Sequence, residues 1–116
     1  LADVAGRSVG AAWPIVAPWV GALGSFIAGS ATFSNMLFAL FQHGVAVDAG
    51  HPPVAILALQ GVGAAAGNMV CVHNVVAACA VAQILGREGQ VIRRTAAPMV
   101  VHVLLAGLLG WALRGG

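Results

Sequence analysis

The sequence predicts an all-α integral membrane protein, and three observations lead to that prediction. Hydrophobic residues make up 60% of the 116 positions, charged residues make up only 7%, and the mean hydropathy is +0.97. A soluble domain carries about 25% charged residues, so these charged side chains are too few to cover a water-facing surface. The apolar residues also gather in long stretches, as membrane helices of about 20 residues require. The composition therefore excludes a free-standing soluble enzyme and a nucleic-acid-binding domain.

The few charges indicate which partners to expect. Five arginines, three acids and no lysine give a net charge of +2, and they form no basic patch, so no nucleic acid is expected. The chain begins at Leu1 without a charged segment before the first apolar run, so we expect no signal peptide. Its length allows about three spanning elements. We expect the C-terminal piece of a longer multi-pass protein, whose partners are the lipid bilayer and the rest of the transmembrane chain.

The first apolar stretch covers residues 9–29 and contains two prolines, Pro14 and Pro18. Proline lacks a backbone donor and interrupts helical hydrogen bonding. We therefore expect a helix that is kinked or that begins only after Pro18. A polar group follows at residues 30–35, and a second apolar arm then runs to Val47.

The second arm decides how this segment enters the membrane. A helix from Phe33 to Val47 rises only about 22 Å, which is short of the bilayer core of about 30 Å. Two full spans joined by so short a polar turn are not expected. We predict a re-entrant helical hairpin over residues 9–47, with a polar tip at mid-membrane, where it is buried in protein or lines a water-filled cavity.

The third apolar stretch, residues 54–85, is too long for one simple span and is interrupted by glycines. Gly61, Gly63 and Gly67 each cost about 1 kcal/mol relative to alanine in a helix interior. We therefore predict a broken transmembrane helix, with two halves joined by an unwound GAAAGN segment that ends at Asn68. Gly63 and Gly67 also form a small-xxx-small pair, which permits close helix packing whether or not the helix is broken.

The main cluster of charges follows, in a predicted loop at residues 86–95. Arg87, Arg93 and Arg94 place this loop on the cytoplasmic side by the positive-inside rule. The hairpin then opens outward and the broken helix crosses inward. One further transmembrane helix over residues 96–113 crosses back.

The two cysteines do not predict a disulfide or a metal site. Cys71 and Cys79 are eight positions apart, which separates them by about 12 Å on a helix. A disulfide needs Cα atoms within about 7 Å. Neither cysteine has metal-ligand spacing with His73. We expect two small helix-packing residues, no metal and no cofactor.

Two polar groups interrupt the apolar segments, at residues 29–35 and 67–74. Polar side chains at membrane depth are expensive and usually face a cavity or another helix. Hydroxyls, amides and helix N-termini are the groups that hold a small ion where no lysine or arginine is present. The alternative roles are helix capping, turn formation and hydroxyl bonding to backbone carbonyls. The candidate substrate- or ion-binding residues are Ser30, Thr32, Ser34, Asn35, Gly67, Asn68 and Asn74.

Among the four histidines, His73 is the candidate for proton coupling. It follows the predicted break directly, and imidazole changes charge near neutral pH. The alternative is a neutral, hydrogen-bonded packing histidine. We expect His102 near the inner end of the last span, at an interface or a helix contact. His43 and His51 are expected to contact solvent.

Three segments of the chain resemble a known family. GALGSFIAGSATFSNMLFALFQ, ALQGVGAAAGNMVCVHNVVAA and LGREGQVIRRT are similar to the C-terminal part of the lactate permease family, and the pairing of GNMVCVHNVVAA with GREG is specific. The resemblance implies a proton-coupled symporter for L-lactate, D-lactate or glycolate in the bacterial cytoplasmic membrane. It also implies an inverted-repeat transporter with hairpins and broken helices. Sodium-coupled relatives of that wider group carry Ser-Asn-Thr motifs at hairpin tips, whereas this tip reads Ser-Ala-Thr-Phe-Ser-Asn.

The expected function is therefore secondary active transport of a small 2-hydroxymonocarboxylate with protons, and not catalysis, because no acid or nucleophile–base pair lies at depth. Two alternatives stay open. One is a sodium-coupled carboxylate or anion transporter of the same architecture. The other is a non-transporting subunit in which the glycines serve helix packing alone.

Overall fold

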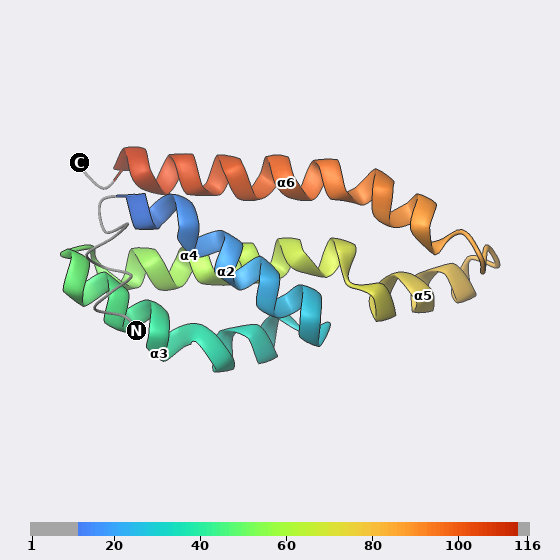
Figure 1. Cartoon of the computed structure of the whole chain (residues 1–116), viewed down its shortest axis with the longest axis horizontal. Helices are drawn as coiled ribbons and strands as arrows, with labels where there is room; N and C mark the ends of the chain where they lie inside the picture. The colour runs from blue at the N-terminus through green and yellow to red at the C-terminus, as the bar shows by residue number, and fades with distance from the viewer. Residues whose placement is uncertain (1–11, 114–116) are drawn as a thin grey trace.

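The computed structural model describes residues 12–113, and every regular element in that range is a helix (Figure 1). The helices are α2 (Trp13–Ala28), α3 (Ala31–Ala49), α4 (Pro53–Gly67), the 3-10 helix η2 (Asn68–Val70), α5 (Val72–Val81) and α6 (Glu88–Leu113). Two helical segments, Pro53–Val70 and Glu88–Leu113, are long and apolar enough to cross a membrane. The predicted all-helical class is thus confirmed.

Helix α2 begins earlier than the prolines predicted. It begins at Trp13, with Pro14 in its first turn, and Pro18 lies inside the helix. A proline in the first turn removes an N–H that would have no helical partner, so Pro14 is compatible with the helix start. The expectation that the helix begins only after Pro18 is wrong. Residues 9–11 of the predicted stretch lie outside the described residues.

Helices α2 and α3 run antiparallel and are joined by only two residues (Figure 1). Gly29 ends α2 in the left-handed conformation, with φ of 76°, and its N–H donates to the Ser25 carbonyl at 2.7 Å. The Ser30 hydroxyl accepts from the Phe33 N–H at 3.2 Å and caps α3. The turn is shorter than the predicted polar tip, and α3 extends to Ala49, beyond the expected end of the second arm.

The break in the third stretch begins only at Asn68, the last residue of the predicted GAAAGN segment, and continues to Cys71. Helix α4 continues through Gly67, and the helical path is interrupted at η2 and at Cys71, which is extended with φ of −66° and ψ of 126°. The glycines stay helical because Gly63 contacts the Pro18 backbone and Gly67 contacts the Ala22 backbone of α2. This close packing offsets the intrinsic cost of glycine in a helix.

The second half-helix and the last helix also differ from the predicted boundaries. Helix α5 ends at Val81, and a turn with left-handed backbone at Gln83 and Gly86 leads to α6. Helix α6 begins at Glu88, so most of the predicted loop at residues 86–95 is helical. Glu88 favours this start because its carboxylate accepts from the Gly86 N–H at 3.0 Å and lies at the positive end of the helix dipole.

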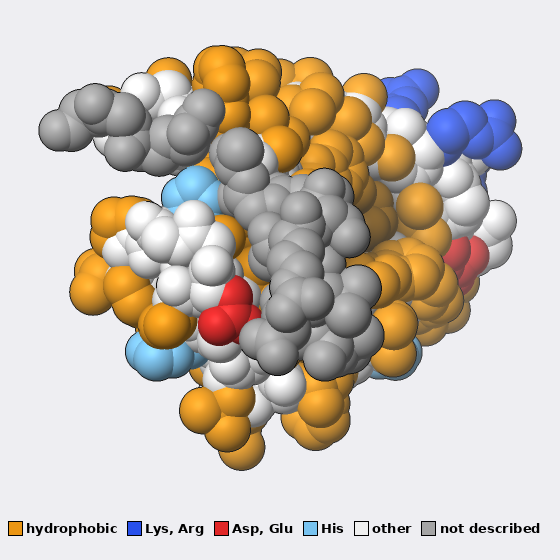
Figure 2. Space-filling view, turned by 60° about the vertical axis from the view of Figure 1, so that its left-hand side comes forward, with side chains coloured by type: hydrophobic (Ala, Val, Ile, Leu, Met, Phe, Trp, Pro, Cys, Tyr) orange, Lys and Arg blue, Asp and Glu red, His pale blue; other side chains and the backbone are white. Residues whose placement is uncertain are grey.

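Helix α2 packs most extensively against α4 and also contacts α3 and α6. The main core lies between α2, α3 and α4 and contains Trp13, Ala17, Val45, Ala46, Ile56 and Leu59. The outer face is apolar as well, since α6 is rich in hydrophobic residues and only Val103 and Gly107 of it are buried. Figure 2 shows hydrophobic side chains over much of the visible surface, with the arginines of the described residues gathered at one end. This exterior suits contact with lipid or with further protein segments.

The α2–α4 contact yields a test with a matched control. A Cβ on Gly63 would overlap the Pro18 carbonyl, whereas a Cβ on Gly61, in the same helix, would meet open space. Gly63→Ala should therefore destabilise the full-length protein by about 1–3 kcal/mol through overpacking. Gly61→Ala should be neutral or stabilising by up to about 1 kcal/mol because alanine is the better helix former.

The measurement is the thermal midpoint of each purified variant in detergent. A Gly63→Ala protein as stable as Gly61→Ala would show that the close backbone contact does not exist.

Candidate functional site

The turn between α2 and α3 contacts the break between α4 and α5. Asn74 Nδ2 donates to the Gly29 carbonyl at 3.2 Å, and Ser25 Oγ donates to Asn68 Oδ1 at 2.8 Å. The His73 ring lies against the Gly29 backbone, where a Cβ would come within 2.6 Å of the His73 Cδ2 atom. The structure thus brings the start of the first polar group, at Gly29, against the second group at residues 67–74, near the middle of the long axis (Figure 1).

The sequence explains why the chain can come so close at this point. Glycine is the residue that adopts the left-handed conformation of Gly29 without strain, and its missing side chain leaves space for the His73 ring and the Cys71 sulfur. On the other side of the contact, Cys71 is extended and α5 begins at Val72 without a side-chain cap.

Two helix N-termini meet at this contact. Helix α3 begins next to Gly29, and α5 begins next to His73. The N-terminus of a helix carries roughly half a positive charge on its unpaired N–H groups. The acidic side chains among residues 12–113, Asp48 and Glu88, lie outside both polar groups. The contact therefore favours negative charge without a basic side chain.

The predicted site residues take different roles. Ser34 is buried and donates to the Gly21 carbonyl at 2.8 Å, whereas Asn35 is half-buried and Thr32 is exposed. Ser30 caps α3, and Gly67 packs on Ala22, so for these two residues the structure shows the alternative roles of capping and packing. Thr32, Ser34 and Asn35 lie in the first turns of α3 and not in a non-helical tip.

The sequence analysis missed a chain of buried amides that leads to Asn35. Trp13 Nε1 donates to Gln42 Oε1 at 2.9 Å, and Gln42 Nε2 donates to Gln60 Oε1 at 2.8 Å. Gln60 Nε2 in turn donates to Ser34 Oγ and to Asn35 Oδ1, each at 3.1 Å. A glutamine inside an apolar helix is itself a signal, because its burial is costly unless both ends of the amide are bonded.

The histidines are placed partly as predicted. His73 is exposed at the break and His43 is exposed on α3, whereas His51 is buried at the junction of α3 and α4. The expectation of solvent contact for His51 is therefore wrong, because the junction folds back and the His51 N–H bonds to the Ala46 carbonyl at 2.8 Å. His102 lies in the middle of α6, because this helix begins at Glu88 and not at residue 96, and it reaches toward α4, in line with the expected helix contact.

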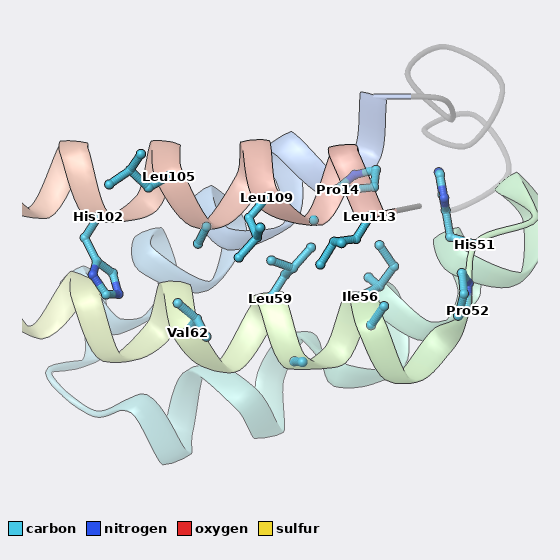
Figure 3. A pocket seen from close by; sticks show the side chains of 14 residues that line it. Pro14, His51, Pro52, Ile56, Leu59, Val62, His102, Leu105, Leu109 and Leu113 are labelled. Atoms are coloured by element: carbon cyan, nitrogen blue, oxygen red, sulfur yellow. The ribbon is translucent and has the colours of Figure 1, made fainter. Parts of the chain in front are cut away.

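An apolar groove lies between α4 and α6, with a volume of about 700 Å³. Figure 3 shows His102 reaching from α6 toward α4, with His51 at the opposite end of the groove. None of the predicted site residues lines this groove. Among the described residues, no group of three His, Cys, Asp or Glu side chains could hold a metal ion, and both cysteines are free and buried.

Comparisons with known proteins give one consistent family. A family model described as L-lactate permease matches residues 2–114. A Haemophilus influenzae protein whose name also refers to L-lactate permease is 42% identical over 85% of this chain and 19% of its own length. The L-lactate permease and the glycolate permease of Escherichia coli K12 are 30% and 29% identical, each over 86% of this chain and 18% of the relative. No solved structure gives a significant match.

This chain thus spans about a fifth of the length of the curated relatives that it matches.

The contact between the turn and the break can be tested with two glycines that share a backbone conformation. Gly29 and Gly50 have φ of 76° and 79°, but a Cβ meets His73 and Cys71 only at Gly29. Both alanine variants should lose about 1–2 kcal/mol through the left-handed backbone. Gly29→Ala should additionally displace the turn and expose the Cys71 thiol.

The measurement is the rate at which Cys71 reacts with a thiol reagent, in a Cys79→Ala background of the full-length protein. Equal rates in the two variants would contradict the contact.

Proposed function

The chain belongs to the L-lactate permease family, and we propose that it forms part of a secondary transporter for L-lactate and related 2-hydroxymonocarboxylates such as glycolate and D-lactate. We place the transporter in the bacterial cytoplasmic membrane, as a multi-pass protein whose remaining chain completes an inverted-repeat architecture. The names of the relatives support the substrate class.

One observation carries the proposal: the helical hairpin α2–α3 ends against a broken helix near the middle of the long axis (Figure 1). Discontinuous helices near the membrane midplane are the elements from which many secondary transporters build their substrate sites. Interrupted backbone at that depth requires a cavity or a protein partner. The alternative of a pure helix-packing subunit accounts for Gly63 and Gly67 but leaves this polar contact without a role.

The proposed substrate cradle uses neutral donors. The candidate ligands are Thr32, Asn35, Asn68 and Asn74, with the N-termini of α3 and α5 near the break, whereas Ser30, Ser34 and Gly67 serve the capping and packing described above. Amide and hydroxyl donors bind a carboxylate more strongly than a neutral acceptor. Neutral donors also keep the empty site free of fixed charge, so that a carboxylate and a proton can cross together.

The proposed topology follows from the two ends of the molecule. The α3–α4 junction and the C-terminal end of α6 lie at one end of the long axis, and the α5–α6 connection lies at the other (Figure 1). Arg87, Arg93 and Arg94 at the second end favour the cytoplasmic side. The hairpin α2–α3 would then be re-entrant from the outside, with its turn at mid-membrane.

The cradle predicts the effect of truncating an asparagine at the break. Asn68→Ala in the full-length protein should raise the half-saturating concentration of L-lactate by up to about a hundredfold, because a hydrogen bond to a charged group contributes about 1.5–3 kcal/mol. Gln90→Ala, at an exposed position of α6, should leave uptake unchanged.

The measurement is uptake of labelled L-lactate, corrected for protein abundance in the membrane. Normal uptake by the Asn68→Ala variant would remove this residue from the site. A wild-type protein that takes up neither lactate nor glycolate would overturn the proposed function.

Proton coupling is proposed for His73, which is exposed at the break and in contact with the hairpin turn. Glutamine can hydrogen-bond at this position but does not titrate. In His73→Gln, proton-driven accumulation of lactate should therefore collapse, whereas exchange of lactate across the membrane, which needs no net proton movement, should survive.

Accumulation and exchange are measured in the same vesicles, with His43→Gln as the control because His43 is exposed on α3 away from the break. A His73→Gln protein that still accumulates lactate would exclude His73 as the proton carrier. Loss of both activities in proportion to protein abundance would indicate a packing histidine.

A further inference from the structure

A continuous row of hydrogen-bonded side chains runs through the interior from the start of α2 to the start of α3. We call it the amide relay, and it consists of Trp13, Gln42, Gln60 and Asn35. Gln42 is 0% exposed and Gln60 is 1% exposed, so water does not compete for these bonds. The relay crosses three helices, because Gln42 lies on α3 and Gln60 on α4.

The orientation of the first amide is fixed by two groups that have only one hydrogen-bonding role. The indole N–H of Trp13 can only donate, so the Gln42 atom 2.9 Å from it must be the oxygen. The backbone carbonyl of Ala17 can only accept, so the Gln42 atom 2.9 Å from it must be the nitrogen. Reversing this amide would place two donors together at one end and two acceptors together at the other.

The fixed orientation passes from one amide to the next. Gln42 Nε2 meets Gln60 at 2.8 Å, so the Gln60 atom there is the oxygen and its nitrogen lies at the far end. That nitrogen donates to Ser34 Oγ and to Asn35, so the Asn35 atom facing it is the oxygen. Each reversed amide would leave a buried donor or acceptor unpaired, which is costly in an apolar interior.

The relay fixes which end of the Asn35 amide is bonded and which end is free. Its Oδ1 accepts from Gln60, and its Nδ2 makes no hydrogen bond within the described part of the chain. The relay therefore leaves two N–H donors available in the second turn of α3. At the break, Asn68 Oδ1 likewise accepts from Ser25 Oγ at 2.8 Å.

We propose that Trp13, Gln42 and Gln60 are positioning residues that hold the Asn35 amide with its N–H₂ group toward the substrate, so that the site offers donors to a carboxylate instead of an oxygen ligand to a cation. This inference rests on the proposed function and adds a reason why the site selects an anion over a cation. It assigns the preference for an anion to residues that do not touch the substrate.

The test is a double-mutant cycle in the full-length protein, with Gln60→Met and Asn35→Ala. Removing Gln60 leaves Gln42 bonded to the Ala17 carbonyl and Ser34 bonded to the Gly21 carbonyl, so Asn35 is the side chain that loses its only bond. Gln60→Met should raise the half-saturating L-lactate concentration about three- to tenfold, with the maximal rate unchanged. In the Asn35→Ala background the same substitution should have no further effect.

Independent effects of the two substitutions, multiplying in the double variant, would overturn the relay and leave Gln60 with a merely structural role. Gln90→Met, at an exposed position of α6, is the matched control and should change neither parameter. Uptake by the wild-type protein distinguishes a failure of the proposed function from a failure of the relay. A wild type that carries no lactate overturns the proposed function and this inference together, whereas a transporting wild type with additive variants overturns the relay alone.

A second comparison keeps Gln60 intact and so does not depend on how well Gln60→Met folds. Asn35→Asp retains an oxygen for Gln60 to donate to, but it replaces the N–H₂ donors by negative charge. If Asn35 donates to a carboxylate, Asn35→Asp should bind lactate at least tenfold more weakly than Asn35→Ala. Uptake by Asn35→Asp that equals or exceeds that of Asn35→Ala, or that becomes sodium-stimulated, would show that Asn35 holds a cation and would overturn the inference.

Discussion

The backbone contact between α2 and α4 is the constraint on which the rest of the structure depends. Gly63 lies on the Pro18 backbone and Gly67 on the Ala22 backbone, with no side chain between them. In a membrane, van der Waals packing and hydrogen bonds hold helices together because lipid is as apolar as the side chains. Once α2 is fixed on α4 in this register, its last turn lies beside Asn68. The meeting of the hairpin turn with the break is therefore a consequence of small residues one to three turns away.

The α2–α4 contact makes the amide relay possible. The relay in turn selects the register in which these helices pack. Gln42 and Gln60 reach each other directly only because α3 and α4 both pack closely on α2. Every buried side-chain nitrogen or oxygen among the described residues has a hydrogen-bond partner. A slip of one residue between any two of these helices would break that pairing in an apolar interior, where an unpaired amide is expensive. The apolar residues hold the helices together, and the relay selects one register.

Sequence reasoning predicted the features that depend on composition and spacing, and it failed where tertiary packing decides. The helical class, the close packing at Gly63 and Gly67 and the buried positions of the two cysteines follow from local rules. The position of the break does not follow from local rules. The intrinsic cost of glycine in a helix predicts a break at Gly63 and Gly67, but their contact with α2 offsets that cost. Helix α6 begins early, at Glu88, whose carboxylate accepts from the Gly86 N–H in the preceding turn, and a charge count does not reveal that bond. The buried glutamines give a weak signal in the sequence because Gln60 is the one polar side chain of α4 and stands outside both polar clusters.

The distribution of paired and unpaired polar groups separates the packed side of the molecule from its candidate site. On the packed side, the amides of Gln42 and Gln60 are bonded at both ends by the chain itself. The His73 ring at the contact between the turn and the break, and the Asn35 N–H₂ group and Thr32 hydroxyl farther along α3, have no hydrogen-bond partner within the described residues. At membrane depth such groups persist only where something else supplies the missing bonds. The chain thus completes its own hydrogen bonding on the packed side and leaves open donors near the contact, as the carboxylate cradle that we propose requires.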